Sequence, residues 1–348
     1  SINELDKIDV RFENLKKIQT VFLNCYFNSP NTKNSFNSLI SDKETDFSRY
    51  NYFYALYLYD IGSIDEARDV INSALKIYPR NLLLNQYKID LDKNTNKQSF
   101  NCKNAGHIVA EILYITANAL SSQSIYSLSN FYLNLAKYLN EDFNSYETLV
   151  AENLYKINNY DEAKKIYNNL NKKGKAFQWY SSKQLARIYL KEDDQDKALE
   201  LISNAYKNLS QKDIYDTFDY AEFLKNNEKF KQSIIYYTEI INKIKKDHPL
   251  YADVTDGRGV AHERIDEWKK AEKDLLSSLE AEPNQAYVIN YLAYSWIEQG
   301  IKIQKSLEML RKANELRSND PYITDSLGWA TIQTSKNLKK LKNIFQLA

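Results

Sequence analysis

The sequence predicts an all-α fold, a solenoid of antiparallel helix pairs. Small residues recur at intervals near 34 positions along most of the chain, and a second small residue comes 12 positions before nearly every one of them. The 348 residues include only 7 Gly and 5 Pro, too few for the many tight turns of a β-sandwich or barrel. Self-similarity at one fixed period is typical of a repeat protein.

Two series of small residues mark the expected helix crossings. The series in the first helix of each pair is Ala55, Ala117, Ala151, Ala186, Ala221, Gly259 and Ala293. The series in the second helix is Ala67, Ser129, Ala163, Ala198, Ser233, Ala271 and Ser306, with spacings, by subtraction, of 62, 34, 35, 35, 38 and 35. Because two helices approach closely only where side chains are small, each pair of positions predicts one helical hairpin.

The first hairpin is clearest around "YLYDIGSIDEARDVINSALKIYPRN". Gly62 provides the turn, and Ala67 and Ile71 lie on the apolar side of the second helix. We predict this unit and an extra helix at residues 48–91, and then a polar loop at residues 92–106. The loop explains the interval of 62 and is a candidate division of the solenoid into two segments.

The two ends are less regular. Residues 1–47 are predicted to be a helical N-terminal segment, with a helix near residues 10–27, or a degenerate repeat. Residues 107–348 continue the array, and the last unit is expected to be degenerate or truncated because Lys340 stands in its second helix where Ala or Ser belongs. The charged start lacks Met, so we expect a fragment or a processed product whose targeting signal lies outside this sequence.

Composition excludes several classes of protein. The 47 basic and 46 acidic residues give a net charge of +1, so no overall attraction to nucleic acid is expected. No run of 18 apolar residues is present, and the sequence therefore predicts no transmembrane helix in this chain.

Residues for catalysis or metal binding are scarce. His107, His248 and His262 lie in different units without the i, i+4 spacing of a helical zinc site, and His262 occupies a packing position. Cys25 and Cys102 fit no metal or redox motif, and their spacing neither indicates nor excludes a disulfide, which leaves the redox compartment open. We expect no enzyme, no cofactor and no metal.

The paired small residues, the polar or Gly turn and the closing Pro79 and Pro283 resemble the tetratricopeptide repeat (TPR) motif over residues 48–348. The resemblance implies a right-handed superhelix whose first helices line a concave, peptide-binding face. "YVINYLAYSWIEQG" and "DPYITDSLGWA" resemble one bacterial TPR group more closely, although Ala293 replaces the usual Gly and regularity ends after Thr331. Members of that group are commonly exported envelope scaffolds, and some are adaptors for envelope proteases. This implies the periplasm or envelope, with the cytoplasm as the alternative.

Two binding modes are considered for the concave face. In a carboxylate clamp, three successive units would offer Tyr114 with Asn118, Thr148 with Glu152, and Lys183 with Arg187. Glu152 stands where Asn belongs and would repel the ligand. The preferred mode is a Tyr-rich groove for an apolar or aromatic segment. The full set of candidate partner-binding residues is Tyr52, Tyr59, Tyr114, Asn118, Lys183, Arg187, Phe218, Asn290, Tyr294 and Trp329.

The aromatic candidates also have an alternative interpretation. The chain contains 28 Tyr, and some of these rings would pack between helices instead of binding a partner. The sequence as a whole predicts a non-catalytic scaffold or adaptor for a protein or peptide partner. The alternative function is the repeat part of a larger enzyme or regulator. Neither the partner nor the oligomeric state is predicted.

Overall fold

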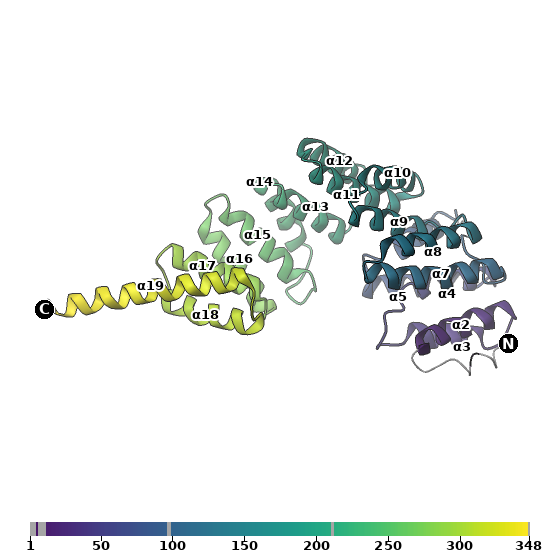
Figure 1. Ribbon diagram of the computed structural model, residues 1–348, viewed down its shortest axis with the longest axis horizontal. Helices are drawn as coiled ribbons and strands as arrows, with labels where there is room; N and C mark the ends of the chain where they lie inside the picture. The colour runs from purple at the N-terminus through teal and green to yellow at the C-terminus, as the bar shows by residue number, and fades with distance from the viewer. Residues whose placement is uncertain (1–4, 6–11, 96–98, 210–211, 347–348) are drawn as a thin grey trace. The chain divides into compact units, whose positions relative to one another are not determined.

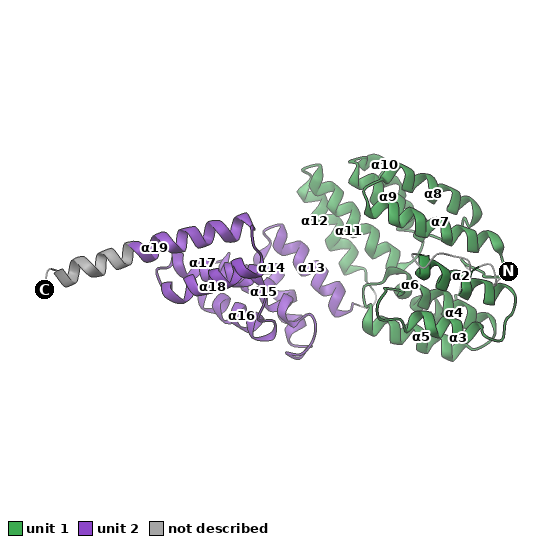
Figure 2. Cartoon of the chain, turned by 60° about the horizontal axis from the view of Figure 1, so that its bottom comes forward, with its two compact units in different colours: residues 1–210 green, residues 211–348 purple. Residues whose placement is uncertain are grey.

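The computed structural model describes residues 5, 12–95, 99–209 and 212–346, with side chains up to residue 335 (Figure 1). Eighteen helices and no strand occur in these ranges. The chain divides into two compact units, residues 1–210 and residues 211–348 (Figure 2). The predicted all-α class is therefore confirmed.

The helices follow one another in pairs joined by short turns. In unit 1 they are α2 (Glu13–Tyr26), α3 (Thr32–Ile40), α4 (Tyr50–Asp60), α5 (Ile64–Ile77), α6 (Leu82–Asp92), α7 (Ala105–Ser122), α8 (Tyr126–Leu139), α9 (Ser145–Lys156), α10 (Tyr160–Leu170), α11 (Lys175–Lys191) and α12 (Gln195–Lys207). In unit 2 they are α13 (Ile214–Asn226), α14 (Phe230–Ile241), α15 (Tyr251–Glu263), α16 (Trp268–Ala281), α17 (Ala286–Glu298), α18 (Ile303–Leu316) and α19 (Pro321–Gln346).

The helix crossings lie at the two series of small residues, as the sequence predicted. All thirteen Ala and Ser residues of the two series have 0% exposure. At Gly259, a Cβ atom would lie only 3.0 Å from the Cγ atom of Leu275 in the partner helix. The repeat period therefore reflects positions where two helices leave no room for a larger side chain.

Seven of the hairpins turn through a residue in the left-handed region, with φ between 59° and 82°. These residues are Gly62, Ser124, Asn158, Asp193, Glu228, Asp266 and Gly300. In each turn the next backbone N–H donates to a carbonyl five residues back, as from Ser63 to Leu58 at 2.8 Å. This is the Schellman ending of a helix, and it caps orphan carbonyl groups.

The interval of 62 residues holds α6 and a following segment. Asn81 caps α6, its side chain accepting from the Leu84 N–H at 3.1 Å. The helix packs against α5 and also against the distant α11. There the Gln86 amide lies so close to the backbone that a Cβ atom at Gly174 would come within 2.2 Å of it. The extra helix thus ties the first hairpin to a later one.

Both ends differ in detail from the predicted elements. The expected N-terminal helix is α2, while residues 10 and 11 of the predicted span lie outside the described residues. The last unit was expected to be degenerate or truncated, and there α19 continues unbroken from Pro321 to Gln346. The segment "KNLKKLKN" offers helix-forming Lys and Leu and no Gly to end a helix, so the chain does not turn. Lys340 lies beyond the described side chains.

Candidate functional site

The candidate site is the face formed by the first helix of each hairpin, called here the helix-A face. In unit 1 it comprises α4, α7, α9 and α11, and in unit 2 it comprises α13, α15, α17 and α19. Neighbouring A helices pack against each other, as α13 does on α15 and α17 on α19. The face is described separately for each unit.

The first part of the unit 1 face is covered by the chain itself. Tyr52 is only 3% exposed, its hydroxyl group is hydrogen-bonded to Ser99 at 2.6 Å, and its ring stacks on Phe143. Burial raises the pKa of Tyr52 to about 12. Tyr59 packs half-buried against the same core. The candidate Tyr52 therefore belongs to the core rather than to an open groove, because α6 and the segment after it lie over this part of the face.

A cavity of about 520 Å³ remains in the same region of unit 1, between α6 and the start of α11. Tyr52 and Phe143 line its apolar side, while Asp90 and Lys173 line its polar side. Its wall is anchored by hydrogen bonds such as the one from the Ala176 N–H to Gln86 at 3.0 Å.

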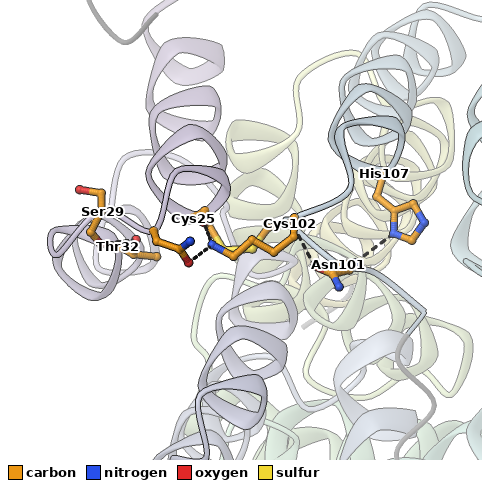
Figure 3. The surroundings of a disulfide bond; sticks show 8 residues. Cys25, Ser29, Thr32, Asn101, Cys102 and His107 are labelled. Carbon is orange, nitrogen blue, oxygen red and sulfur yellow. Dashed lines mark hydrogen bonds between the residues drawn. A yellow bond between two sulfur atoms is a disulfide. The ribbon is translucent and has the colours of Figure 1, made fainter.

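A disulfide fixes the covering segment. Cys25 of α2 is bonded to Cys102, with their Cα atoms 5.9 Å apart, a normal separation for such a bond (Figure 3). Lys103 donates to the carbonyl group of Cys25, and the N–H of Asn101 donates to Nδ1 of His107 at 3.0 Å. The sequence spacing gave no sign of this bond, since the two residues are 77 positions apart.

An arginine is held over a tyrosine at the next part of the unit 1 face. Arg49 donates to both oxygens of Glu111, at 2.7 and 2.8 Å, and its guanidinium group lies 3.8 Å from the ring centre of Tyr114. The candidate Tyr114 is thus half-buried and engaged within the chain, whereas the candidate Asn118 is exposed.

A second arginine of unit 1 is engaged in the same way. Arg187 donates to both oxygens of Glu152 at 3.0 Å and lies 3.8 Å from the ring centre of Tyr155. Lys183 lies 5.3 Å from the ring of Trp179. Glu152, the residue expected to repel a carboxylate ligand, is thus paired with Arg187 within the chain.

In unit 2 the structure brings two candidate residues to one carboxylate. The indole N–H of Trp329 (α19) donates to Glu298 (α17) at 2.8 Å. Burial first, and then the charge of Glu298, raises the pKa of the Tyr294 hydroxyl group. Tyr294 is 38% exposed, so its ring is open to a ligand. Asn290, one turn earlier on α17, has a buried Oδ1 atom without a hydrogen-bond partner. The candidate Phe218 is buried in the core of α13 and α14.

Further carboxylates lie on α13 and α15, the other two A helices of unit 2. Tyr237 donates to Glu222, and Tyr291 donates to Glu263 at 2.7 Å. Asp256 makes no side-chain hydrogen bond within the described part of the chain, and burial raises the pKa of its carboxyl group to about 6. In the two tyrosine pairs a phenolic O–H donates to a carboxylate oxygen, so the donor brings no positive charge.

Comparison with known proteins agrees with the repeat geometry. No protein-family profile matches the chain. It is similar to a TPR repeat-containing protein of Pseudomonas aeruginosa, with 28% identity over 116 residues, or 33% of this chain and 19% of that protein. The chain therefore spans only a small part of that relative. The matching repeat, with its buried small residues and Schellman turns, decides the class.

The chain folds as a solenoid of the tetratricopeptide repeat (TPR) type.

The chain also resembles solved structures, two of which follow. One is a chain of the APC/C hetero-tetramer Cut9–Hcn1, with 14% identity and a TM-score of 0.48, covering 94% of this chain and 58% of that one. Another is the C-terminal part of a TPR repeat-containing protein from Cytophaga hutchinsonii, with 16% identity and a TM-score of 0.46. The match covers 66% of this chain and 90% of that one.

Sequence reasoning missed the carboxylates of this TPR chain. Asp256, Asn290 and Asp325 lie three positions before the small residue of successive A helices, yet only Asn290 was selected. The usable signal is this shared register, since equivalent positions in neighbouring repeats lie side by side. Glu298 was missed because it lies at the end of its helix, outside the aromatic pattern.

The described residues contain neither a cluster suited to a metal ion nor a helix suited to span a membrane. Among the described residues, no group of three or more His, Cys, Asp or Glu is placed to hold a metal ion. The same residues include no helix with the length and apolar character needed to cross a membrane. His262 is 6% exposed with Nδ1 2.7 Å from Glu267, in agreement with the packing role predicted for it.

Proposed function

We propose that this TPR chain is a non-catalytic scaffold or adaptor that binds a segment of a partner protein on the helix-A face of unit 2. The observation that carries the proposal is the group formed by Tyr294, Glu298 and Trp329. It joins side chains of two successive A helices at a surface where Tyr294 stays 38% exposed. Solenoid repeats use such continuous faces for binding.

The contrast with unit 1 supports the choice of face. There Tyr52 is buried, and Arg49 and Arg187 are already paired with Glu111 and Glu152. A partner would have to break these contacts before it could use them. Of the residues predicted from the sequence, Asn290, Tyr294 and Trp329 remain the preferred binding residues, and the unit 1 residues Tyr59, Tyr114, Asn118, Lys183 and Arg187 remain secondary candidates.

We further propose an oxidising compartment as the place of action. The disulfide between Cys25 and Cys102 is the supporting observation, because such bonds persist mainly outside the reducing cytosol. This agrees with the exported proteins that the sequence resembles. In the alternative, a repeat part of a larger enzyme or regulator, the same face would still be the recognition surface.

The experiment is site-specific photo-crosslinking in native extracts. A photoreactive phenylalanine analogue is placed at position 294, and in a control protein at position 138, where an 81% exposed tyrosine lies on α8, away from the helix-A face. We expect a partner that is crosslinked from position 294 only, and weaker capture by the double variant Tyr294→Ala with Trp329→Ala. Trp329→Phe keeps an aromatic ring at this position and removes the N–H donor. Equal crosslinking from both positions, or unchanged capture by the folded double variant, would contradict the proposal.

A further inference from the structure

The chemistry of the partner segment can be inferred from unit 2, on the basis of the proposed function. We propose that the helix-A face of unit 2 binds a basic segment of a partner protein, and that Tyr294 and Glu298 together receive one of its arginine or lysine side chains.

Acidic residues are concentrated on three of the A helices of unit 2. Together α13, α15 and α17 carry seven Asp or Glu and two Lys or Arg, whereas α19 carries one Asp and four Lys. The B helices α14, α16 and α18 carry six Asp or Glu and seven Lys or Arg. Of the two cations on α13, α15 and α17, Arg258 is bound to Asp274 of α16 at 2.7 and 2.8 Å. The acidic excess of unit 2 therefore lies on these three helices.

The carboxylates form a continuous series across the A helices. Asp256 interacts electrostatically with Glu222 and Lys225 of α13, and also with Tyr291 of α17. The next link runs from α17 to α19. Tyr294 interacts with Glu298 on its own helix and with Asp325 on α19. Acidic groups of successive A helices therefore lie close enough to interact, and Lys225 is the cation that interacts with Asp256.

Unit 1 contains two sites in which a carboxylate and a tyrosine ring together bind an arginine. A carboxylate and a tyrosine ring hold an arginine there twice, as Glu111 and Tyr114 hold Arg49, and as Glu152 and Tyr155 hold Arg187. In both cases the guanidinium carbon lies 3.8 Å from the ring centre. A guanidinium group is bound well by this arrangement, since it donates in the plane to the carboxylate and stacks on the ring.

Tyr294 and Glu298 provide the same two groups without a cation. Within the part of the chain that the structure describes, no Lys or Arg forms an ion pair with Glu298 or lies over the ring of Tyr294. The buried Oδ1 of Asn290, an acceptor with no hydrogen-bond partner, lies one turn away on the same helix. Both observations point to a donor, positively charged ligand from outside the chain.

The repeat also sets the spacing of the partner's charges. Packed helices lie about 8–10 Å apart, and an extended chain advances about 3.3 Å per residue, so successive A helices match every third residue of an extended segment. The probe is therefore a twelve-residue fluorescent peptide with Arg at every third position among Gly and Ser. Two further peptides carry citrulline, which keeps the shape without the charge, or Glu at the same positions.

Binding of each peptide to the full chain is measured by fluorescence anisotropy at several salt concentrations. We expect the Arg peptide to bind, with an affinity that falls as salt rises, and the citrulline and Glu peptides to bind at least about tenfold more weakly, as loss of one charge-assisted hydrogen bond implies. Glu298→Gln and Tyr294→Ala should each weaken binding of the Arg peptide by about tenfold. Glu315→Gln, which removes an exposed charge from the B helix α18, is the matched control and should change it less than about twofold.

Two results would overturn the inference. One is equal binding of the Arg and citrulline peptides, and the other is an equal effect of Glu298→Gln and Glu315→Gln, which would indicate attraction by net charge alone. If either occurs while crosslinking from position 294 still captures a partner, the proposed function stands without a basic ligand. If that crosslinking fails as well, the face itself is wrong.

Discussion

Arg49 and Glu111, 62 positions apart, form a bidentate ion pair in which the carboxylate side chain has 0% exposure. Arg49 immediately precedes α4 and Glu111 lies on α7, so the pair joins the hairpins on either side of the long interval. In this irregular interval the two hairpins are connected by a buried charge pair. Such a pair is vulnerable, because removing one partner leaves the other charge buried alone.

Glu111→Gln is therefore expected to destabilise unit 1 by about 3 kcal/mol. The neutral amide keeps the shape of the side chain but leaves the guanidinium group of Arg49 without a counter-charge. Hydrogen exchange measured by mass spectrometry should show faster exchange in α4 and α7, with α15 and α16 unchanged.

The matched control is Glu280→Gln, which breaks the exposed pair with Lys246 and should produce no measurable change. Replacing both members, as Arg49→Leu with Glu111→Leu, should recover much of the lost stability, because no buried charge then remains. If Glu111→Gln exchanges like the unchanged protein, the pair is not a determinant of stability.

Reduction of the disulfide should loosen the N-terminal part of unit 1. The bond closes a loop of 77 residues, for which the chain-entropy estimate is about 4 kcal/mol of stabilisation. With dithiothreitol, or in Cys25→Ala with Cys102→Ala, we expect faster hydrogen exchange in α2 and in the segment around Phe100. Unit 2 serves as the internal control. Two free thiols in the protein isolated under non-reducing conditions, detected by alkylation, would show that the bond does not form.

Substitution of Gly by Ala is expected to have opposite effects on stability at two positions, Gly62 and Gly328. Neither Gly62 nor Gly328 has any atom within 4 Å of an added Cβ, so the effect comes from the backbone alone. Gly62 has φ of 82° in the first hairpin turn, and Gly62→Ala should cost about 1 kcal/mol. Gly328 lies inside α19, and Gly328→Ala should stabilise that helix by about 0.5–1 kcal/mol. Thermal unfolding of both variants provides the test, and shifts of the same sign would contradict it.

The sequence predicted the parts of this fold that packing constrains at every repeat. A helix crossing admits only a small side chain, so Ala55, Ala151 and their equivalents are visible as a period. The turns are less visible, because the left-handed position is Gly only at Gly62 and Gly300, and is taken by residues such as Glu228 elsewhere. There the hydrogen bonds of the Schellman ending, rather than the residue type, impose the conformation.

Contacts between distant segments could not be predicted in the same way. The register of Tyr52 places it on the helix-A face, but no periodicity shows that α6 and the segment near Ser99 cover it. The bond between Cys25 and Cys102 has no sequence signal either. The excess of acidic residues on α13, α15 and α17 was hidden because the net charge of the whole chain is near zero, and it appears only when the helices are counted separately.

Asp256 gives the last prediction, a pH dependence of stability in unit 2. Burial raises the pKa of its carboxyl group from the ordinary 3.8 to about 6 in the folded protein. The charged groups that face it are Glu222 and Lys225 from α13 and Asp253 from α15, and the neutral phenols of Tyr237 from α14 and Tyr291 from α17 also face it. Between pH 4 and 6 the folded state holds a proton that the unfolded state has released, so the free energy of unfolding falls as pH rises through this interval.

Asp256→Asn removes this titration. The variant should be more stable than the unchanged protein by roughly 1–2 kcal/mol above pH 6, an amount reduced by partial solvent screening, and the difference should vanish near pH 4. Urea unfolding from pH 4 to 7, followed by hydrogen exchange in α13 to α17, measures it, with Glu315→Gln as the control that keeps the original pH profile. Because a bound cation would favour the ionised carboxylate, the Arg peptide should shift the interval toward lower pH. A variant with the same pH profile as the unchanged protein would show that Asp256 is not held in the folded state as described.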